Sequence, residues 1–386
     1  MVKKMVRVGL RWAMNVERLL GGLRLLADPG EVKSVLVLEY RLPLGCLVHM
    51  TPFFEAVKAD RPELVVTVAT RGLGAEFLRH NPCVDFVVMT PDALVDTVGA
   101  AKVLDAELTR LGVRPDCVLT GASDTRSRMA LLGMLLRRGW RGGFTLVPEM
   151  YQWSLEYAAD KSLIDNNLRL AALVGCEMGH REPKVYFSTE DVAAADGMVS
   201  DANADGRPLV VMVTQASGGQ NTGWHAARFV EVIRYASEVL GCCVIFVGTA
   251  GDTAAVEALR LAAGGIGLSV TGRTSVTELA ALLAMSDAVV SLDTGTMHVG
   301  RSVGVPMVVM GPSWQKPLEW LPLGVPQVRI LRGVDREGVP QGYKLDEVEA
   351  GDVTAALQGL LEAYPASAET RAQRIGAGLS GVDHRA

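Results

Sequence analysis

The chain has 386 residues, of which 49% are hydrophobic and 21% are charged, and its net charge at pH 7 is −5. This length exceeds one ordinary domain and favours two domains, each with a core of its own. The negative charge argues against a nucleic-acid partner, and no apolar run reaches the roughly 18 residues of a membrane-spanning helix.

The six cysteines include no Cys-x-x-Cys pair. This usage favours reduced thiols in a cytoplasmic protein over disulfide bonds or a zinc site.

Residues 1–30 read as a basic amphipathic extension. On a helical wheel, one side carries five basic residues: Lys3, Lys4, Arg7, Arg11 and Arg18. One interpretation is that residues 1–26 lie on the inner face of the plasma membrane, which would make the protein peripheral there. The alternative is a packed extension with a solvated basic face. Charges interrupt its apolar region and no small-residue cleavage site follows, which argues against a signal peptide.

Strands and helices alternate through residues 31–188. We expect strands at residues 34–39, 64–69, 84–89 and 116–120, and helices at 52–59 and 100–111, with a loop at 41–45. A polar region at residues 153–175 reads as helical. Strands that alternate with long helices predict a parallel sheet with helices on both faces, which is a Rossmann-like domain.

The same pattern repeats in residues 189–365, after a connector that ends near residue 207. We expect strands at residues 209–214, 243–247 and 288–292, and helices at 226–240, 253–263 and 277–285. Two doubly wound α/β domains that face a cleft form the GT-B architecture. Residues 366–386 lack a core pattern and read as a mobile tail.

Two small-residue loops follow strands of the second domain. Ser217 and Gly218 belong to the first, and Thr294, Gly295 and Thr296 belong to the second. Backbone N–H groups, hydroxyl groups and a helix N-terminus can bracket a pyrophosphate at such strand ends. The alternative is that both loops are only tight turns.

Three further residues each have two interpretations. Asp252 follows a strand end, where it could bind ribose hydroxyls or cap the next helix. Thr274 is either a ligand contact or only the residue before Ser275, which could itself be a helix cap. His298 is either a ligand contact or a structural histidine under its loop.

From about residue 35 to 331, the chain resembles the ADP-heptose:lipopolysaccharide heptosyltransferase family, glycosyltransferase family 9. The resemblance rests on stretches that occur in the family's order: residues 41–45 with Thr51 and Pro52, residues 81–85, 217–224, 293–298 and 300–313. It implies an inverting, metal-independent transferase without a cofactor. The donor would be a nucleotide-diphospho-sugar such as ADP-heptose, and the acceptor a lipopolysaccharide core or another glycan or lipid-linked hydroxyl.

The resemblance also implies residue roles. Asp293 would hold the donor sugar, and the donor site would contain Ser217, Gly218, Thr222, Asp252, Thr274, Thr294, Gly295, Thr296 and His298.

Two positions depart from the family pattern. Cys46 stands where the family has the Asp that is taken as general base, and Thr222 stands where it commonly has a Lys that neutralises the diphosphate. A thiol is a poor substitute for a carboxylate, so His49, one helical turn further, becomes the favoured base. Asp293 is the other candidate base, unless it holds the donor sugar as its family counterpart does. Arg273, Arg301 or Lys316 could supply the missing cation.

These departures leave two alternatives beside a working transferase. One is a binding-only relative that retains the nucleotide-sugar cradle, and the other is different GT-B chemistry such as a nucleotide-sugar epimerase.

Overall fold

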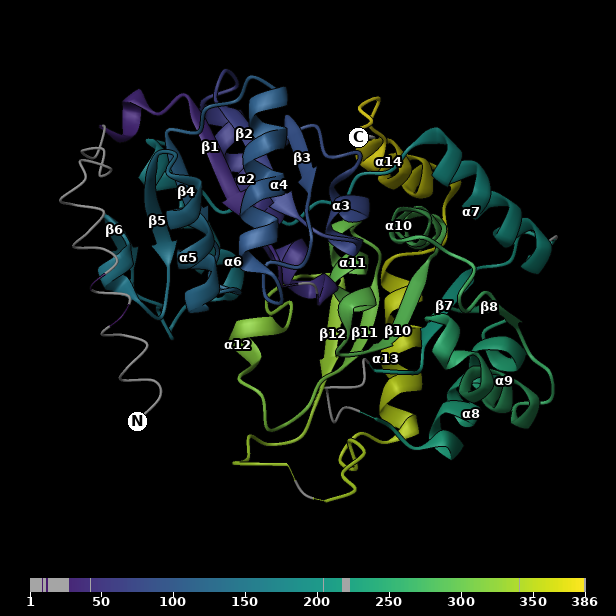
Figure 1. Ribbon diagram of the computed structural model, residues 1–386. Helices are drawn as coiled ribbons and strands as arrows, with labels where there is room; N and C mark the ends of the chain where they lie inside the picture. Colours follow the sequence, from purple (N-terminus) through teal and green to yellow (C-terminus); the bar gives the residue numbers. More distant parts are fainter. Residues whose placement is uncertain are drawn as a thin grey trace. The chain divides into compact units, whose positions relative to one another are not determined.

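The computed structural model describes residues 9, 12, 28–41, 43–203, 205–216, 223–339 and 341–384. The chain divides into two compact units (Figure 1): unit 1 comprises residues 1–183 and 382–386, and unit 2 comprises residues 184–381. The basic residues expected on an N-terminal helix lie outside the described residues.

Unit 1 is built on a six-stranded parallel sheet with the order β3-β2-β1-β4-β5-β6. Its strands are short apolar runs, and every residue of β1 is buried, as expected for a parallel sheet covered on both faces. The strands are β1 (Ser34–Leu38), β2 (Val65–Thr70), β3 (Phe86–Met89), β4 (Cys117–Thr120), β5 (Trp140–Phe144) and β6 (Trp153–Leu155). The α-helices are α2 (Leu44–Asp60), α3 (Leu73–Leu78), α4 (Thr97–Arg110), α5 (Ser127–Leu136) and α6 (Leu163–Leu168).

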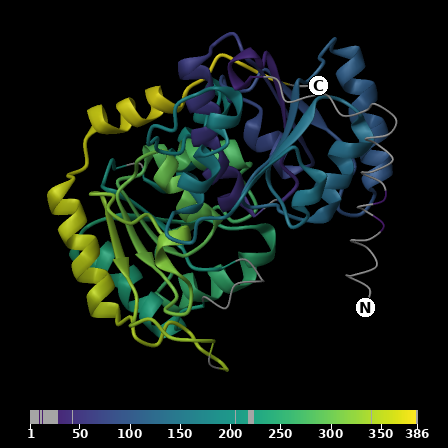
Figure 2. The same ribbon diagram turned by 90° about the vertical axis from the view of Figure 1, so that its left-hand side faces the viewer.

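Unit 2 has a second six-stranded parallel sheet, with the order β12-β11-β10-β7-β8-β9. Its strands are β7 (Leu209–Val213), β8 (Cys243–Phe246), β9 (Leu268–Ser269), β10 (Ala288–Leu292), β11 (Met307–Met310) and β12 (Val328–Leu331). The α-helices are α7 (Thr189–Ala202), α8 (Ala226–Arg234), α9 (Thr253–Ala262), α10 (Val276–Met285), α11 (Gly295–Ser302), α12 (Pro317–Trp320), α13 (Ala350–Ala363) and α14 (Ala368–Gly378). Helix α13, yellow in Figure 2, packs against β10 and β11.

Each sheet changes winding direction at one point. In unit 1 the chain adds strands on one side of β1 and then on the other, beginning with β4, so the switch lies between β1 and β4. In unit 2 the same reasoning places the switch between β7 and β10. Sheets of this class bind ligands in the crevice outside the carboxyl ends of the strands at such a switch point. The segments that follow these four strands are therefore the candidate ligand-binding segments.

The predicted loop at residues 41–45 is wrong in extent, because α2 begins at Leu44 and continues to Asp60. The prediction placed the helix start at Pro52, which lies inside the helix instead. Proline lacks the N–H that would bond to the Val48 carbonyl one turn earlier. The Thr51 hydroxyl donates to that carbonyl at 2.9 Å and compensates for the missing bond. Cys46 and His49 therefore lie in the first turns of α2.

Two regions between the sheets also differ from the prediction. Residues 153–175 contain strand β6, helix α6 and a 3₁₀ turn (Ala171–Val174) rather than a continuous helix. The expected connector at 189–207 is largely helix α7, which begins with a capping box between Ser188 and Asp191.

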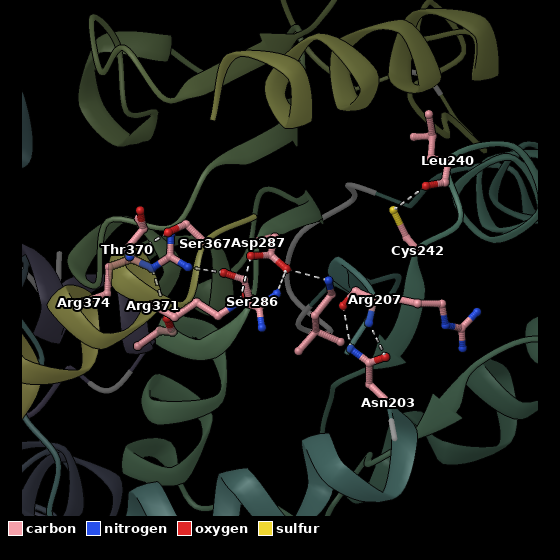
Figure 3. Close-up of polar contacts among 12 residues, drawn as sticks. Asn203, Arg207, Leu240, Cys242, Ser286, Asp287, Ser367, Thr370, Arg371 and Arg374 are labelled. Carbon is pink, nitrogen blue, oxygen red and sulfur yellow. Dashed lines mark hydrogen bonds and ion pairs between the residues drawn. The ribbon is translucent and has the colours of Figure 1, made fainter. Parts of the chain in front are cut away.

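The prediction of a mobile tail over residues 366–386 did not foresee α14, which forms at residues 368–378 and packs against α10. Arg371 pairs through both Nε and Nη2 with the carboxylate of Asp287, whose exposed fraction is 2%. Arg374 Nε donates to the Ala284 carbonyl at 3.0 Å, and its Nη2 donates to the Ser286 carbonyl (Figure 3). These contacts are polar, so apolar periodicity could not predict them.

None of the helices in the described ranges combines the length and apolar character required to cross a membrane.

Candidate active site

The first candidate segment joins β10 to α11 in unit 2. Asp293 and Thr294 follow the strand, and Thr294 is the N-cap residue of α11 with extended backbone geometry. Its side chain makes no capping hydrogen bond, so the first N–H groups of the helix are not satisfied by it. Gly295 and Thr296, in that first turn, are only half-buried. N–H groups that the N-cap side chain leaves uncapped, together with the positive end of the helix dipole, make this turn suitable for an anion.

Two side chains of this segment are buried with unsatisfied polar atoms. Asp293 Oδ2 and Thr294 Oγ1 have no hydrogen-bond partner among the described residues. Burial raises the pKa of Asp293 from 3.8 to about 6, and its exposed fraction is 1%. Buried polar atoms are nearly always hydrogen-bonded in native structures, so two orphans in adjacent residues indicate a ligand contact. A sugar hydroxyl or a phosphate oxygen would satisfy them.

His298 lies on α11 and is buried. Its ring meets the ring of Trp320 edge to face, with 6.3 Å between the centroids. Burial, and to a smaller extent the charge of Arg301, lowers the pKa of His298 to about 3, so its imidazole is neutral at pH 7. A neutral ring under the loop fits the structural interpretation of His298 at least as well as a charged contact to a diphosphate.

Asp252 and the segment around Thr274 occupy helix starts. Asp252 Oδ2 accepts hydrogen bonds from the N–H and hydroxyl of Thr249, at 2.7 and 2.8 Å, in a capping box. Thr274 is half-buried and precedes Ser275, which caps α10 in a second box with Glu278. Ser275 therefore caps its helix, whereas the Asp252 side chain closes a 3₁₀ turn and makes no capping hydrogen bond to α9 (Thr253–Ala262).

The loop with Ser217, Gly218 and Thr222 lies outside the described residues. Of the three cations considered as substitutes for a lysine at Thr222, Arg273 and Lys316 are exposed, and Arg301 lies in the last turn of α11.

Sequence reasoning missed Arg332, which lies one residue after β12. Its Nη2 donates to the carbonyls of Pro312 and Gln315, each at 3.1 Å, and it forms an ion pair with Asp335. Arg332 therefore holds the loop that follows β11 and places a cation beside it.

The second candidate segment joins β1 to α2 in unit 1. Cys46 and His49 lie on the first two turns of α2, and each side chain has an exposed fraction of 1%. Burial raises the pKa of Cys46 to about 12, and the nearby charge of Glu39 adds to the effect. Cys46 is thus a neutral thiol at physiological pH and unsuited to the role of a base.

Glu39, which follows β1, was not selected from the sequence. Its exposed fraction is 1%, and neither carboxyl oxygen forms a hydrogen bond of normal geometry with the described residues. Burial, followed by the charge of Asp124, raises the pKa of Glu39 well above its usual range. The available signal was a lone acid at the end of an apolar strand, which the prediction had counted as part of the strand.

No group of three or more His, Cys, Asp or Glu side chains in the part of the chain that the structure describes is arranged to hold a metal ion.

The family model described as "Glycosyltransferase family 9 (heptosyltransferase)" matches residues 127–336, more than half of the chain. No curated protein matches the sequence significantly.

Solved structures of low sequence identity share the fold over nearly their whole length. A glycosyl transferase family 9 protein from Veillonella parvula is 18% identical, with a TM-score of 0.76, and the match covers 88% of this chain and 99% of that one. ADP-heptose lps heptosyltransferase II from E. coli is also 18% identical, with a TM-score of 0.72 and coverage of 86% and 100%. E. coli heptosyltransferase WaaC, solved with ADP-2-deoxy-2-fluoro heptose, is 16% identical, with a TM-score of 0.63 and coverage of 84% and 99%. The predicted GT-B fold is confirmed.

Proposed function

Because the chain belongs to glycosyltransferase family 9, the heptosyltransferase family, we propose that it transfers heptose from ADP-heptose to an acceptor hydroxyl. The acceptor would be a lipopolysaccharide core or another glycan or lipid-linked sugar. Reaction on such an acceptor would occur in the cytoplasm at the inner face of the plasma membrane, and residues 1–26 would contribute to that contact.

The observation that carries the donor assignment is the pair of unsatisfied atoms in Asp293 and Thr294 beside the open turn of α11. The N–H groups of Gly295 and Thr296 and the Thr294 hydroxyl would bind the diphosphate, and Asp293 would accept hydrogen bonds from the sugar. A heptosyltransferase of the same fold has been solved with ADP-2-deoxy-2-fluoro heptose, which supports this choice of donor.

The remaining donor contacts would come from the other predicted residues. Ser217 and Gly218 would face the diphosphate from the loop after β7, and Thr222 would supply a hydroxyl in place of the family's Lys. Asp252 and Thr274 would approach the nucleoside, and His298 would support the loop with a neutral ring.

Transfer would invert the anomeric carbon and would proceed without a metal ion or cofactor. The acceptor oxygen attacks from the side opposite the diphosphate while a base removes its proton. His49 was the base favoured by sequence, and Cys46 marks the position of the family base.

The high pKa of the Cys46 thiol favours one alternative, a relative that binds nucleotide sugars without turnover. Acceptor-dependent release of ADP from ADP-heptose separates the two functions. We expect the full chain to release ADP with a heptose-free lipopolysaccharide core, and an Asp293→Asn variant to be at least about 100-fold slower. Tight donor binding without ADP release by the wild type would instead establish the binding-only alternative.

A further inference from the structure

Glu39 lies at the switch point of the sheet in unit 1. Leu38, the last residue of β1, pairs with Thr120 of β4, so Glu39 and Gly121 are the first residues beyond the two strands of the switch point. Glu39 Oε2 lies 3.6 Å from the position that a β-carbon on Gly121 would occupy. The carboxyl group thus reaches across from the end of β1 to the end of β4, where doubly wound sheets bind ligands.

The Glu39 carboxyl lacks the strong hydrogen bonds that a buried structural carboxyl usually accepts. The backbone N–H of Arg41 lies near enough to lower the pKa of Glu39, but neither buried Oε atom has a hydrogen bond of normal geometry to the described residues. A neighbouring carboxylate shows the contrast: Asp124, equally buried, accepts from Arg126 Nε at 2.7 Å and from Nη2 at 3.0 Å. An unsatisfied buried carboxyl costs stability and calls for a reason.

Burial and the nearby arginine charges act on the pKa of Glu39 in opposite directions. Burial raises the pKa of Glu39 most, and the charge of Asp124, on the segment after β4, adds to the effect. The charges of Arg41 and Arg126 and the backbone N–H of Arg41 lower it and favour the carboxylate form that a base requires. Cys46 on α2 is a neutral thiol and Asn167 on α6 is an amide, so these two neighbours add no charge. A carboxylate with a raised proton affinity is a stronger base than an ordinary surface carboxylate.

Resting on the proposed function, we propose that Glu39 is the general base that takes the acceptor's proton, in the role that the family gives to the Asp replaced here by Cys46. The acceptor oxygen forms a bond to the anomeric carbon of the donor. The bond from that carbon to the diphosphate oxygen breaks, and its electron pair leaves with the diphosphate. The hydroxyl proton moves to a Glu39 carboxyl oxygen.

Glu39 is buried, so an acceptor would reach it by displacing the polar contact between the segments that follow β1 and β4. Arg41 follows β1 closely, and its Nη1 donates to the carbonyl of Ser123, after β4, at 3.0 Å. We expect the acceptor to replace this contact, since Arg41 is otherwise exposed.

The test compares Glu39→Gln with two matched variants in acceptor-dependent ADP release. Glu39→Gln keeps the shape of the protonated acid but cannot accept a proton, so kcat should fall at least about 100-fold while the donor Kd stays within about twofold. Glu63→Gln removes an exposed acid of unit 1 and should leave kcat unchanged. Adding Cys46→Asp to Glu39→Gln should recover at least about tenfold of the lost kcat, because a carboxylate returns to the family position.

A kcat for Glu39→Gln within about threefold of wild type would overturn the role of Glu39 while leaving the transferase function intact. A wild type that binds ADP-heptose but never releases ADP would instead refute the transferase function itself. Glu39→Asp serves if Glu39→Gln fails to fold. It keeps the acid but withdraws it by one methylene, so kcat should fall and the acid limb of the pH profile should shift. An unaltered kcat and pH profile would contradict the proposal.

Discussion

At the scale of residues, the two sheets carry a similar feature. Asp293 and Glu39 each follow a central strand at the switch point of their own sheet, each is buried, and each has unsatisfied carboxyl oxygen. Buried acids of this kind are costly for stability and are typical of sites that a ligand completes. The proposed assignment gives one acid to the donor sugar and the other to the acceptor proton.

The raised pKa of Asp293 predicts how stability depends on pH. The folded state binds the Asp293 proton more tightly than the unfolded state does. Ionisation of Asp293 therefore lowers the free energy of unfolding, by nothing below about pH 4 and by its full amount above about pH 6. A shift of about two pKa units corresponds to about 3 kcal/mol. Asp293→Asn should therefore gain about 3 kcal/mol over wild type between pH 4 and pH 8, measured by urea unfolding. A difference between the two proteins that does not change with pH would contradict the burial of an unpaired Asp293.

At the scale of elements, sequence predicted those that are held together by apolar packing. The run from Ala288 to Leu292 and the turn that follows it were recognised because apolar periodicity ends at small polar residues. The start of α2 was missed because Pro52 looked like a helix start. Only the structure shows that the Thr51 hydroxyl donates a hydrogen bond to the Val48 carbonyl, which Pro52 cannot do. Helix α14 was missed because its main contacts are made by arginines.

Helix α14 supplies a prediction about stability. Replacing Arg371 by Met leaves the buried Asp287 carboxylate without its guanidinium partner and should destabilise unit 2 by about 3 kcal/mol. Asp287→Asn in the same chain should restore part of the loss, because an amide oxygen can still accept from the Leu209 N–H. Gln373→Ala, on the exposed side of α14, is the control and should change little. Chemical denaturation measures all three variants, and an Arg371→Met protein as stable as the control would show that the pair contributes nothing.

At the scale of the whole molecule, the repeated α/β pattern was sufficient to predict two doubly wound domains and the GT-B fold. The candidate site was predicted only in part. The turn at residues 293–298 carries a readable motif, whereas Glu39 is a single acid whose burial depends on β4, α2 and α6 folding around it. The local sequence does not reveal whether a buried side chain finds hydrogen-bond partners in the folded protein.

The central claim is that unit 2 binds ADP-heptose at the turn between β10 and α11. The most direct measurement is the shift in unfolding temperature of the full chain with ADP-heptose, compared with UDP-, GDP- and dTDP-sugars. At a hundred times its Kd, ADP-heptose should stabilise the protein by about 2.7 kcal/mol, and a Thr294→Val variant should lose most of this gain. No shift with any of these nucleotide sugars, or an undiminished shift in Thr294→Val, would contradict the claim.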